Sequence, residues 1–178
     1  MEKKIIIING SGGAGKDTFV EYCSEFRKVL NISTVDKVKE AAKILVGWDG
    51  TKDDKSRKLL VDLKRLSIEY NDAPTKYIVA KAEEFKTSED ELMFIHIREA
   101  EEIEKAKQLL NANTLLVTNP NVAIITSNDS DAKVNEYNYD YTILNDGSLE
   151  DLKNKAEEFV NNITPVKDTK VYKNTNNS

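Results

Sequence analysis

The chain has 178 residues, of which 32% are charged, and a formal net charge of −5. This length is enough for one domain with a real core. The negative charge argues against a protein that wraps a nucleic-acid backbone, which needs a basic field. Cys23 is the only cysteine and His96 the only histidine, which excludes a disulfide framework and a zinc site of clustered cysteines or histidines. No apolar run approaches the roughly 20 residues of a membrane span, and residues 1–4 are polar, so we expect a cytoplasmic protein with no membrane partner.

The first half of the chain alternates apolar β-branched runs with segments of helical periodicity. The pattern predicts a strand at 4–9, a helix at 16–30, a strand at 31–35, helices at 36–48 and 55–71, and a further helix that begins at Pro74. The helix at 16–30 places Phe19, Val20, Cys23, Phe26 and Leu30 on one apolar stripe. In the helix at 55–71 the residues at helical spacing are Leu59, Leu63, Leu66 and Tyr70. Asp36 is the expected N-cap of the helix at 36–48.

The second half continues the alternation. The pattern predicts strands at 91–97, 113–118 and 139–144, a weaker strand at 122–126, and helices at 98–110 and 148–160, the last with Ser148 and Asp151 as a capping pair. The tail at 164–178 lacks apolar periodicity, so we expect it to be flexible and the folded domain to span residues 1–163.

Strands that alternate with helices predict an α/β fold, a three-layer sandwich around a mostly parallel sheet of about five strands. Ligands of such sheets bind at the carboxyl ends of the strands. The segment from Gly10 to Asp17, together with Asp36 and Arg98, follows three of the predicted strands. These residues are therefore the first candidates for a functional site.

Gly10, Gly15 and Lys16 satisfy the spacing G-x-x-x-x-G-K between a predicted strand and an amphipathic helix. Glycines let the backbone curl so that its N–H groups point at phosphate oxygens, and the helix adds its positive N-terminal end. Lys16 would supply a charge to the terminal phosphates of a nucleotide. The candidate nucleotide-binding residues are Gly10, Gly12, Gly13, Ala14, Gly15, Lys16, Asp17 and Thr18. The alternative is a glycine-rich turn with an incidental lysine.

Asp17 stands where this motif normally has the serine or threonine whose hydroxyl contacts Mg²⁺. An aspartate could bind the metal through water or orient an acceptor group. It could also stabilise the first turn of the helix by its charge alone. Thr18 offers a hydroxyl one residue further on.

The "GKDT" run resembles the deoxynucleoside monophosphate kinases and the animal-type phosphomevalonate kinases. The segment 35–50 is similar to their D-x-x-K helix, with Asp36 and Lys39 at the matching positions, and 55–66 is similar to their arginine-bearing helix. The segment 94–105 resembles the end of their third strand, and 139–160 resembles the last strand and helix of many small-molecule kinases. The likeness covers most of residues 4–160, although only the loop is a specific motif.

The resemblance implies a P-loop NTPase fold of the nucleotide-kinase type and transfer of the γ-phosphoryl group of ATP, with Mg²⁺, to a small phosphorylated acceptor. The implied catalytic residues are Lys16, Asp17 and Arg98, with Asp17 also toward the metal. Asp36, Lys39, Arg57 and Arg65 are the implied acceptor-binding residues, on helices that span about residues 36–86. Arg57 and Arg65 could instead only solubilise the outer face of their helix.

Two departures from these families stand out. His96 occupies the place of an aspartate, and the lid-like segment at 119–140 contains no arginine and only Lys133 as a cation. Three functions therefore stay open: a nucleoside or deoxynucleoside monophosphate kinase, a kinase for another phosphorylated metabolite, and a nucleotide-binding sensor without efficient transfer. The sequence leaves the oligomeric state open.

Overall fold

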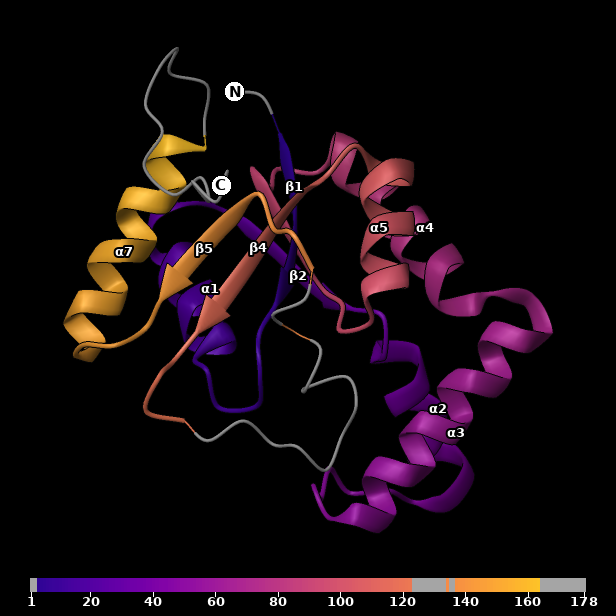
Figure 1. Ribbon diagram of the computed structural model, residues 1–178. Helices are drawn as coiled ribbons and strands as arrows, with labels where there is room; N and C mark the ends of the chain where they lie inside the picture. Colours follow the sequence, from indigo (N-terminus) through magenta and orange to yellow (C-terminus); the bar gives the residue numbers. More distant parts are fainter. Residues whose placement is uncertain (1–2, 123–133, 135–136, 164–178) are drawn as a thin grey trace.

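The structure of the protein is a computed structural model that describes residues 3–122, 134 and 137–163 (Figure 1). Its elements in chain order are β1 Lys4–Asn9, α1 Lys16–Phe26, β2 Val29–Ser33, α2 Asp36–Val46, α3 Asp54–Asn71, α4 Ala73–Thr87, β3 Leu92–His96, α5 Ala100–Leu110, β4 Asn113–Thr118, β5 Tyr141–Leu144 and α7 Leu149–Asn162. Within these ranges, none of the helices has the length and hydropathy required to cross a bilayer. The predicted strand at 122–126, apart from its first residue, Lys133 and the tail at 164–178 lie outside the described residues.

The strands form one parallel sheet in the order β2-β3-β1-β4-β5. The central strand β1 contributes Ile6, Ile7 and Ile8, none of which has exposed surface. A continuous β-branched run suits this position because both faces of a parallel sheet are covered by helices. The predicted α/β sandwich with a sheet of about five strands is confirmed.

The helices cover the sheet in two layers (Figure 1). On one face α1 and α7 pack together, and the rings of Phe19 and Phe159 meet edge to face with centroids 5.5 Å apart. On the other face α4 and α5 bury Ile78, Phe85 and Ile103 against the sheet. The predicted capping box of α7, Ser148 with Asp151, is also confirmed.

The boundary between α1 and β2 differs from the prediction. The helix ends at Phe26, and Leu30 lies in β2, where its partner in the ladder is Met93 of β3. Arg27 already has an extended backbone, with φ −142°. Pairing with β3 therefore overrides the helical periodicity that the side chains alone suggest.

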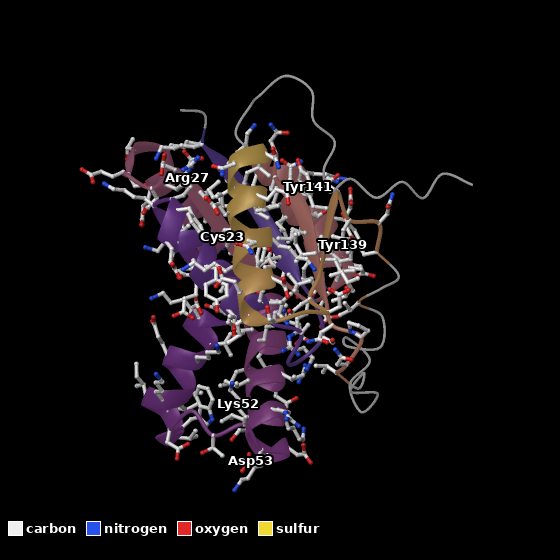
Figure 2. All side chains as sticks on the ribbon, turned by 90° about the vertical axis from the view of Figure 1, so that its left-hand side faces the viewer. Cys23, Arg27, Lys52, Asp53, Tyr139 and Tyr141 are labelled. Carbon is white, nitrogen blue, oxygen red and sulfur yellow. The ribbon has the colours of Figure 1, made fainter. Side chains whose placement is uncertain are left out.

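Helices α2 and α3 project beyond the sheet, and Figure 2 shows Lys52 and Asp53 at the far end of this projection. The expected N-cap is off by one residue: α2 begins at Asp36 and is capped by Val35. The predicted helix at 55–71 is present as α3, but none of its residues is buried, and Tyr70 is 87% exposed. Because α3 packs against α2 and α4 and not against the sheet, its apolar residues keep their helical spacing but do not enter the core.

Candidate functional site

The glycine-rich loop lies at the carboxyl end of β1, and its backbone needs glycine at both ends. Gly10 has φ +152° and Gly15 has φ +98°. A Cβ atom on Gly10 would lie 2.3 Å from the carbonyl oxygen of Val117, and one on Gly15 would lie 2.5 Å from Nδ2 of Asn145. The motif therefore reflects both the positive φ angles and the close approach of β4 and of the segment after β5.

Lys16 is the first residue of α1, and its side chain folds back over the loop. Its Nζ atom donates a hydrogen bond to the carbonyl oxygen of Gly10 and one of 3.0 Å to that of Ser11. The ammonium group and the positive end of α1 are thus directed at the same loop. This arrangement fits the phosphates of a nucleotide, which need N–H donors and a cation at one place. Gly12, Gly13 and Ala14 complete the turn, and Thr18 is half-buried in the first turn of α1.

Two asparagines that sequence reasoning missed hold this loop at its ends. Asn9, the last residue of β1, is 1% exposed and accepts a hydrogen bond of 2.8 Å from the N–H of Gly10. Asn145, just after β5, donates one of 3.0 Å to the carbonyl oxygen of Ala14. The signal for Asn9 was present in the sequence, because an amide ends a run of four isoleucines. Nothing local marked Asn145, since its contact depends on β5 reaching the sheet edge.

Tyr139 is a third residue of the site that the sequence reasoning missed. Its hydroxyl accepts a hydrogen bond from Nδ2 of Asn9 at 2.8 Å and donates one to the carbonyl oxygen of Val134 at 3.0 Å. The same Nδ2 also donates to the carbonyl oxygen of Arg98 at 3.0 Å. Burial raises the pKa of the Tyr139 phenol to about 12, so the hydroxyl keeps its proton at neutral pH. Asn9 thus connects the glycine-rich loop both to Arg98, just after β3, and to Tyr139, in the segment before β5.

His96, at the end of β3, lies between charged residues of the candidate site. Its Nε2 atom is 2.9 Å from Oδ1 of Asn31, and its Nδ1 atom is 3.8 Å from Oδ1 of Asp17. Burial lowers the pKa of His96, and the nearby carboxylate of Asp17 opposes that shift without overcoming it. Lys16, Asp36 and Lys39 also act on the imidazole electrostatically. The structure therefore gathers four of the predicted site residues around the histidine that replaces the expected aspartate.

The carboxylate of Asp17 is the candidate magnesium ligand. Its side chain is 92% exposed beside the loop. Among the described residues, no group of three or more His, Cys, Asp or Glu side chains could hold a metal ion. A single carboxylate is chemically compatible with Mg²⁺, which keeps several waters and is commonly bound by one or two carboxylates and substrate phosphates.

The arginines predicted for the acceptor occupy different surroundings. Arg98, just after β3, lines a cavity of about 660 Å³. Arg57 and Arg65 lie on the exposed surface of α3 and form ion pairs with Asp54 and Glu69 of the same helix. Their role in acceptor binding stays a prediction. Asp36 accepts a hydrogen bond of 2.8 Å from the N–H of Ser33, so it also shapes the turn between β2 and α2.

Searches against protein-family models and against curated proteins find no match for this chain. Solved structures do match. The chain is similar to TT1252 from Thermus thermophilus, with 22% identity, 93% of this chain and 100% of the other covered, and a TM-score of 0.53. It is also similar to dephospho-CoA kinase from Campylobacter jejuni, with 17% identity, coverage of 90% and 97%, and a TM-score of 0.50. A third match is the tunicamycin resistance protein of Deinococcus radiodurans, with 13% identity, coverage of 93% and 98%, and a TM-score of 0.50.

These matches extend over nearly the full length of both chains, and at such identities they establish the fold. The chain shares its α/β fold with these three structures, and its own strand order is the one described above.

Proposed function

We propose that this protein transfers the γ-phosphoryl group of ATP to a small phosphorylated acceptor, most directly a nucleoside or deoxynucleoside monophosphate. The observation that carries the proposal is the closed glycine loop with the Lys16 ammonium over it, next to the cavity that Arg98 lines. The loop supplies the donor site and the cavity the space for an acceptor. The kinase-like fold supports both assignments.

In this reaction an oxygen of the acceptor attacks the γ-phosphorus, and the bond from that phosphorus to the bridging oxygen of ADP breaks. Such a transfer needs positioning and positive charge more than covalent help from the protein. The loop N–H groups and Lys16 would hold the β- and γ-phosphates, and Arg98 would face the transferred group from the cavity. A bound Mg²⁺ would neutralise charge on the phosphate oxygens, with Asp17 orienting its water ligands.

The predicted organisation of the chain completes the proposal. Helices α2, α3 and α4, within residues 36–86, would bind the acceptor, and Asp36 and Lys39 stand where α2 meets the sheet edge. The segment 119–140 would cover the site. Because it contains no arginine, positive charge for catalysis would come mainly from Lys16 and Arg98.

The test is the release of ADP from Mg-ATP with ribo- and deoxyribonucleoside monophosphates added singly. The Lys16→Ala variant is the blank, since it removes the ammonium from the loop but leaves the fold-forming contacts of β1 and α1. Stimulation of ADP release by one acceptor, absent in the blank, would support the proposal and identify the substrate. ATP binding with no stimulation by any nucleotide would reject the nucleotide acceptor.

A second candidate is a nucleotide sensor without efficient transfer. It is favoured by one observation: Arg57 and Arg65 are exposed and paired on their own helix, so neither lines the described cavity. Tight ATP binding with negligible turnover across nucleotide and non-nucleotide phosphates would support this alternative.

A further inference from the structure

His96 is the last residue of β3 and lies on the face of the sheet that α1 covers. Because side chains alternate between the two faces along a strand, His96 shares its face with Leu92 and Phe94, which pack in the core cluster under α1. The His96 side chain is 18% exposed. The imidazole thus continues a row of buried side chains to the point where that row meets Asp17, in the first turn of α1.

The contact with Asn31 determines which nitrogen of the imidazole carries the proton. Nε2 of His96 lies 2.9 Å from Oδ1 of Asn31. A carbonyl oxygen can only accept a hydrogen bond, so Nε2 is the donor. In the neutral ring the other nitrogen, Nδ1, then has no proton and presents a lone pair. Asn31 therefore leaves an unprotonated nitrogen on the side of the ring that faces Asp17.

Two hydrogen-bond acceptors consequently face each other. Nδ1 of His96 lies 3.8 Å from Oδ1 of Asp17, a separation that is too long for a hydrogen bond. A carboxylate, like the unprotonated nitrogen, can only accept. The two atoms cannot satisfy each other, but imidazole nitrogen and carboxylate oxygen can both coordinate one metal ion.

The position of this pair beside the glycine-rich loop allows a nucleotide to complete the coordination of such an ion. Asp17 follows Lys16, whose ammonium lies over the carbonyl oxygens of Gly10 and Ser11. An ion with one or two protein ligands takes its remaining ligands from phosphates and water. Ligands at neighbouring corners of an octahedral ion lie about 3 Å apart, given bonds of about 2.1 Å. The Asp17 side chain is 92% exposed, so its carboxylate has room to close the difference.

An imidazole ligand changes which metal ion the site prefers. Mg²⁺ takes oxygen ligands and keeps its waters, whereas imidazole nitrogen suits first-row transition metals. Mn²⁺ accepts carboxylate, water and phosphate oxygens as Mg²⁺ does, and precedes the stronger nitrogen binders in the same series. Within the described ranges, no group of three His, Cys, Asp or Glu side chains could hold a metal ion. The pair therefore needs the phosphates of a nucleotide to form a complete site.

We propose that Nδ1 of His96 and the carboxylate of Asp17 bind a divalent transition-metal ion together with the phosphates of the bound nucleotide, and that this site prefers Mn²⁺ to Mg²⁺. This inference rests on the proposed function, which puts a nucleotide at the loop, and it specifies the metal ion of that site. Asn31 is a positioning residue, which acts through the ring of His96.

The test uses the full chain with ADP and Mn²⁺ at pH 8. Electron spin echo measurements on bound Mn²⁺ detect nitrogen nuclei that coordinate it directly. Because His96 is the only histidine, protein labelled with ¹⁵N in histidine alone assigns the signal without any variant. We expect a nitrogen coupling that changes from the ¹⁴N to the ¹⁵N pattern with this label. A coupling that the label does not change, no coupling, or no binding of Mn²⁺ with ADP would overturn the inference.

Competition between the two ions measures the preference. Mg²⁺ displaces Mn²⁺ from the complex of protein and ADP, and the EPR signal of released Mn²⁺ gives the ratio of the two affinities. In His96→Gln an amide oxygen replaces the nitrogen, so the preference for Mn²⁺ should fall by at least the roughly tenfold that loss of an outer partner of a metal ligand costs. Glu21→Gln changes an exposed residue one turn further along α1 and is the matched control. Equal preference in wild type and His96→Gln would overturn the inference.

The role of Asn31 is tested by a conservative and a disruptive variant. Asn31→Asp keeps an acceptor for Nε2 and should keep the ¹⁵N coupling, whereas Asn31→Leu removes the acceptor and should weaken Mn²⁺ binding. Equal Mn²⁺ affinity in both would reject the positioning role. In the labelled protein without metal, ¹⁵N NMR should find the proton on Nε2. A proton on Nδ1 would mean that the amide group of Asn31 donates to Nε2, and it would overturn the inference.

The metal readout separates this inference from the proposed function. Coordination of Mn²⁺ by the His96 nitrogen, without phosphoryl transfer to any acceptor, would reject the function and keep the inference. Phosphoryl transfer without nitrogen coupling to Mn²⁺ would keep the function and reject the inference.

Discussion

The side-chain amide of Asn9 donates a hydrogen bond of 2.8 Å to the hydroxyl of Tyr139, 130 residues further along the chain. Tyr139 in turn donates to the carbonyl oxygen of Val134. The geometry of the glycine-rich loop thus depends on Tyr139, which precedes β5 and lies outside the G-x-x-x-x-G-K motif.

Tyr139→Phe removes this hydroxyl while keeping the ring. Because Tyr139 is 3% exposed, the Asn9 amide would lose a buried partner, and the free energy of unfolding should fall by about 1–2 kcal/mol. We also expect weaker ATP binding, since Asn9 orients Gly10. Urea unfolding and ATP titration measure the two effects.

Tyr141→Phe is the control for that substitution. Tyr141 begins β5, and its ring packs edge to face against Phe159 at 5.6 Å, but its hydroxyl has no hydrogen bond to a described residue. Its removal should change neither property. Equal losses of ATP affinity in both variants would contradict a specific role for Tyr139.

Gly10→Ala should be far more costly than the same change elsewhere in the chain. The new Cβ atom would lie 2.3 Å from the Val117 carbonyl oxygen at a φ angle of +152°. We therefore expect the free energy of unfolding to fall by about 2–4 kcal/mol and ATP binding to be lost. Gly50→Ala is the control, because Gly50 has φ +100° with no atom within 4 Å of the new Cβ. Gly50→Ala should lower the free energy of unfolding by about 1 kcal/mol, because only the strain of a positive φ angle acts there. Similar thermal shifts for the two variants would show that the contact with β4 does not constrain the loop.

The parallel sheet could be predicted from the sequence because short runs of neighbouring residues specify its elements. Four isoleucines in a row specify a strand buried on both faces, and the spacing of Gly10, Gly15 and Lys16 specifies the turn that follows. The confirmed capping box of Ser148 and Asp151 is local in the same way. The boundary that failed depended on a distant partner: Leu30 joins β2 because β3 pairs with it. The helical spacing in α3 was correct, but it did not indicate burial, since Tyr70 is exposed where α3 projects beyond the sheet.

The residues of the candidate site show the same difference between local and distant evidence. The loop residues were identified from their spacing, whereas Asn145 and Tyr139 could not be, because each acts through a side-chain contact made more than a hundred residues away. The position of Arg98 at the cavity agrees with its place after a strand, although its catalytic role is still a prediction.

Asp17→Ala should lower turnover more than it lowers ATP affinity. The carboxylate is exposed beside the loop and makes no contact that closes it, so the loop should still bind phosphates. If Asp17 orients the hydration of Mg²⁺, we expect kcat to fall on the order of 10–100-fold with little change in the Kd of ATP. Glu21→Gln, one turn further along α1, is the matched control. If kcat and ATP affinity fell by the same factor, or if neither changed, the catalytic role of Asp17 would be rejected.

His96 makes stability depend on pH in a defined direction. Burial lowers the pKa of His96 below its ordinary value of 6.5, although Asp17 and Asp36 raise it and Lys16 and Lys39 lower it further. The folded protein therefore binds this proton less readily than the unfolded chain. Stability should be complete above about pH 6.5 and should fall as the pH drops below that value, toward the pKa of the folded state.

Two measurements check this expectation. Because His96 is the only histidine, the proton on Cε1 of its ring gives one unambiguous signal in NMR, and titration of that signal should give a pKa below 6.5. Urea unfolding between pH 7.5 and pH 5 should show a steeper loss of stability in the wild type than in His96→Gln, which cannot take up the proton. A pKa above 6.5 would mean that the ion pair with Asp17 outweighs burial. The sign would then reverse, and lowering the pH through that value would stabilise the wild type relative to the variant.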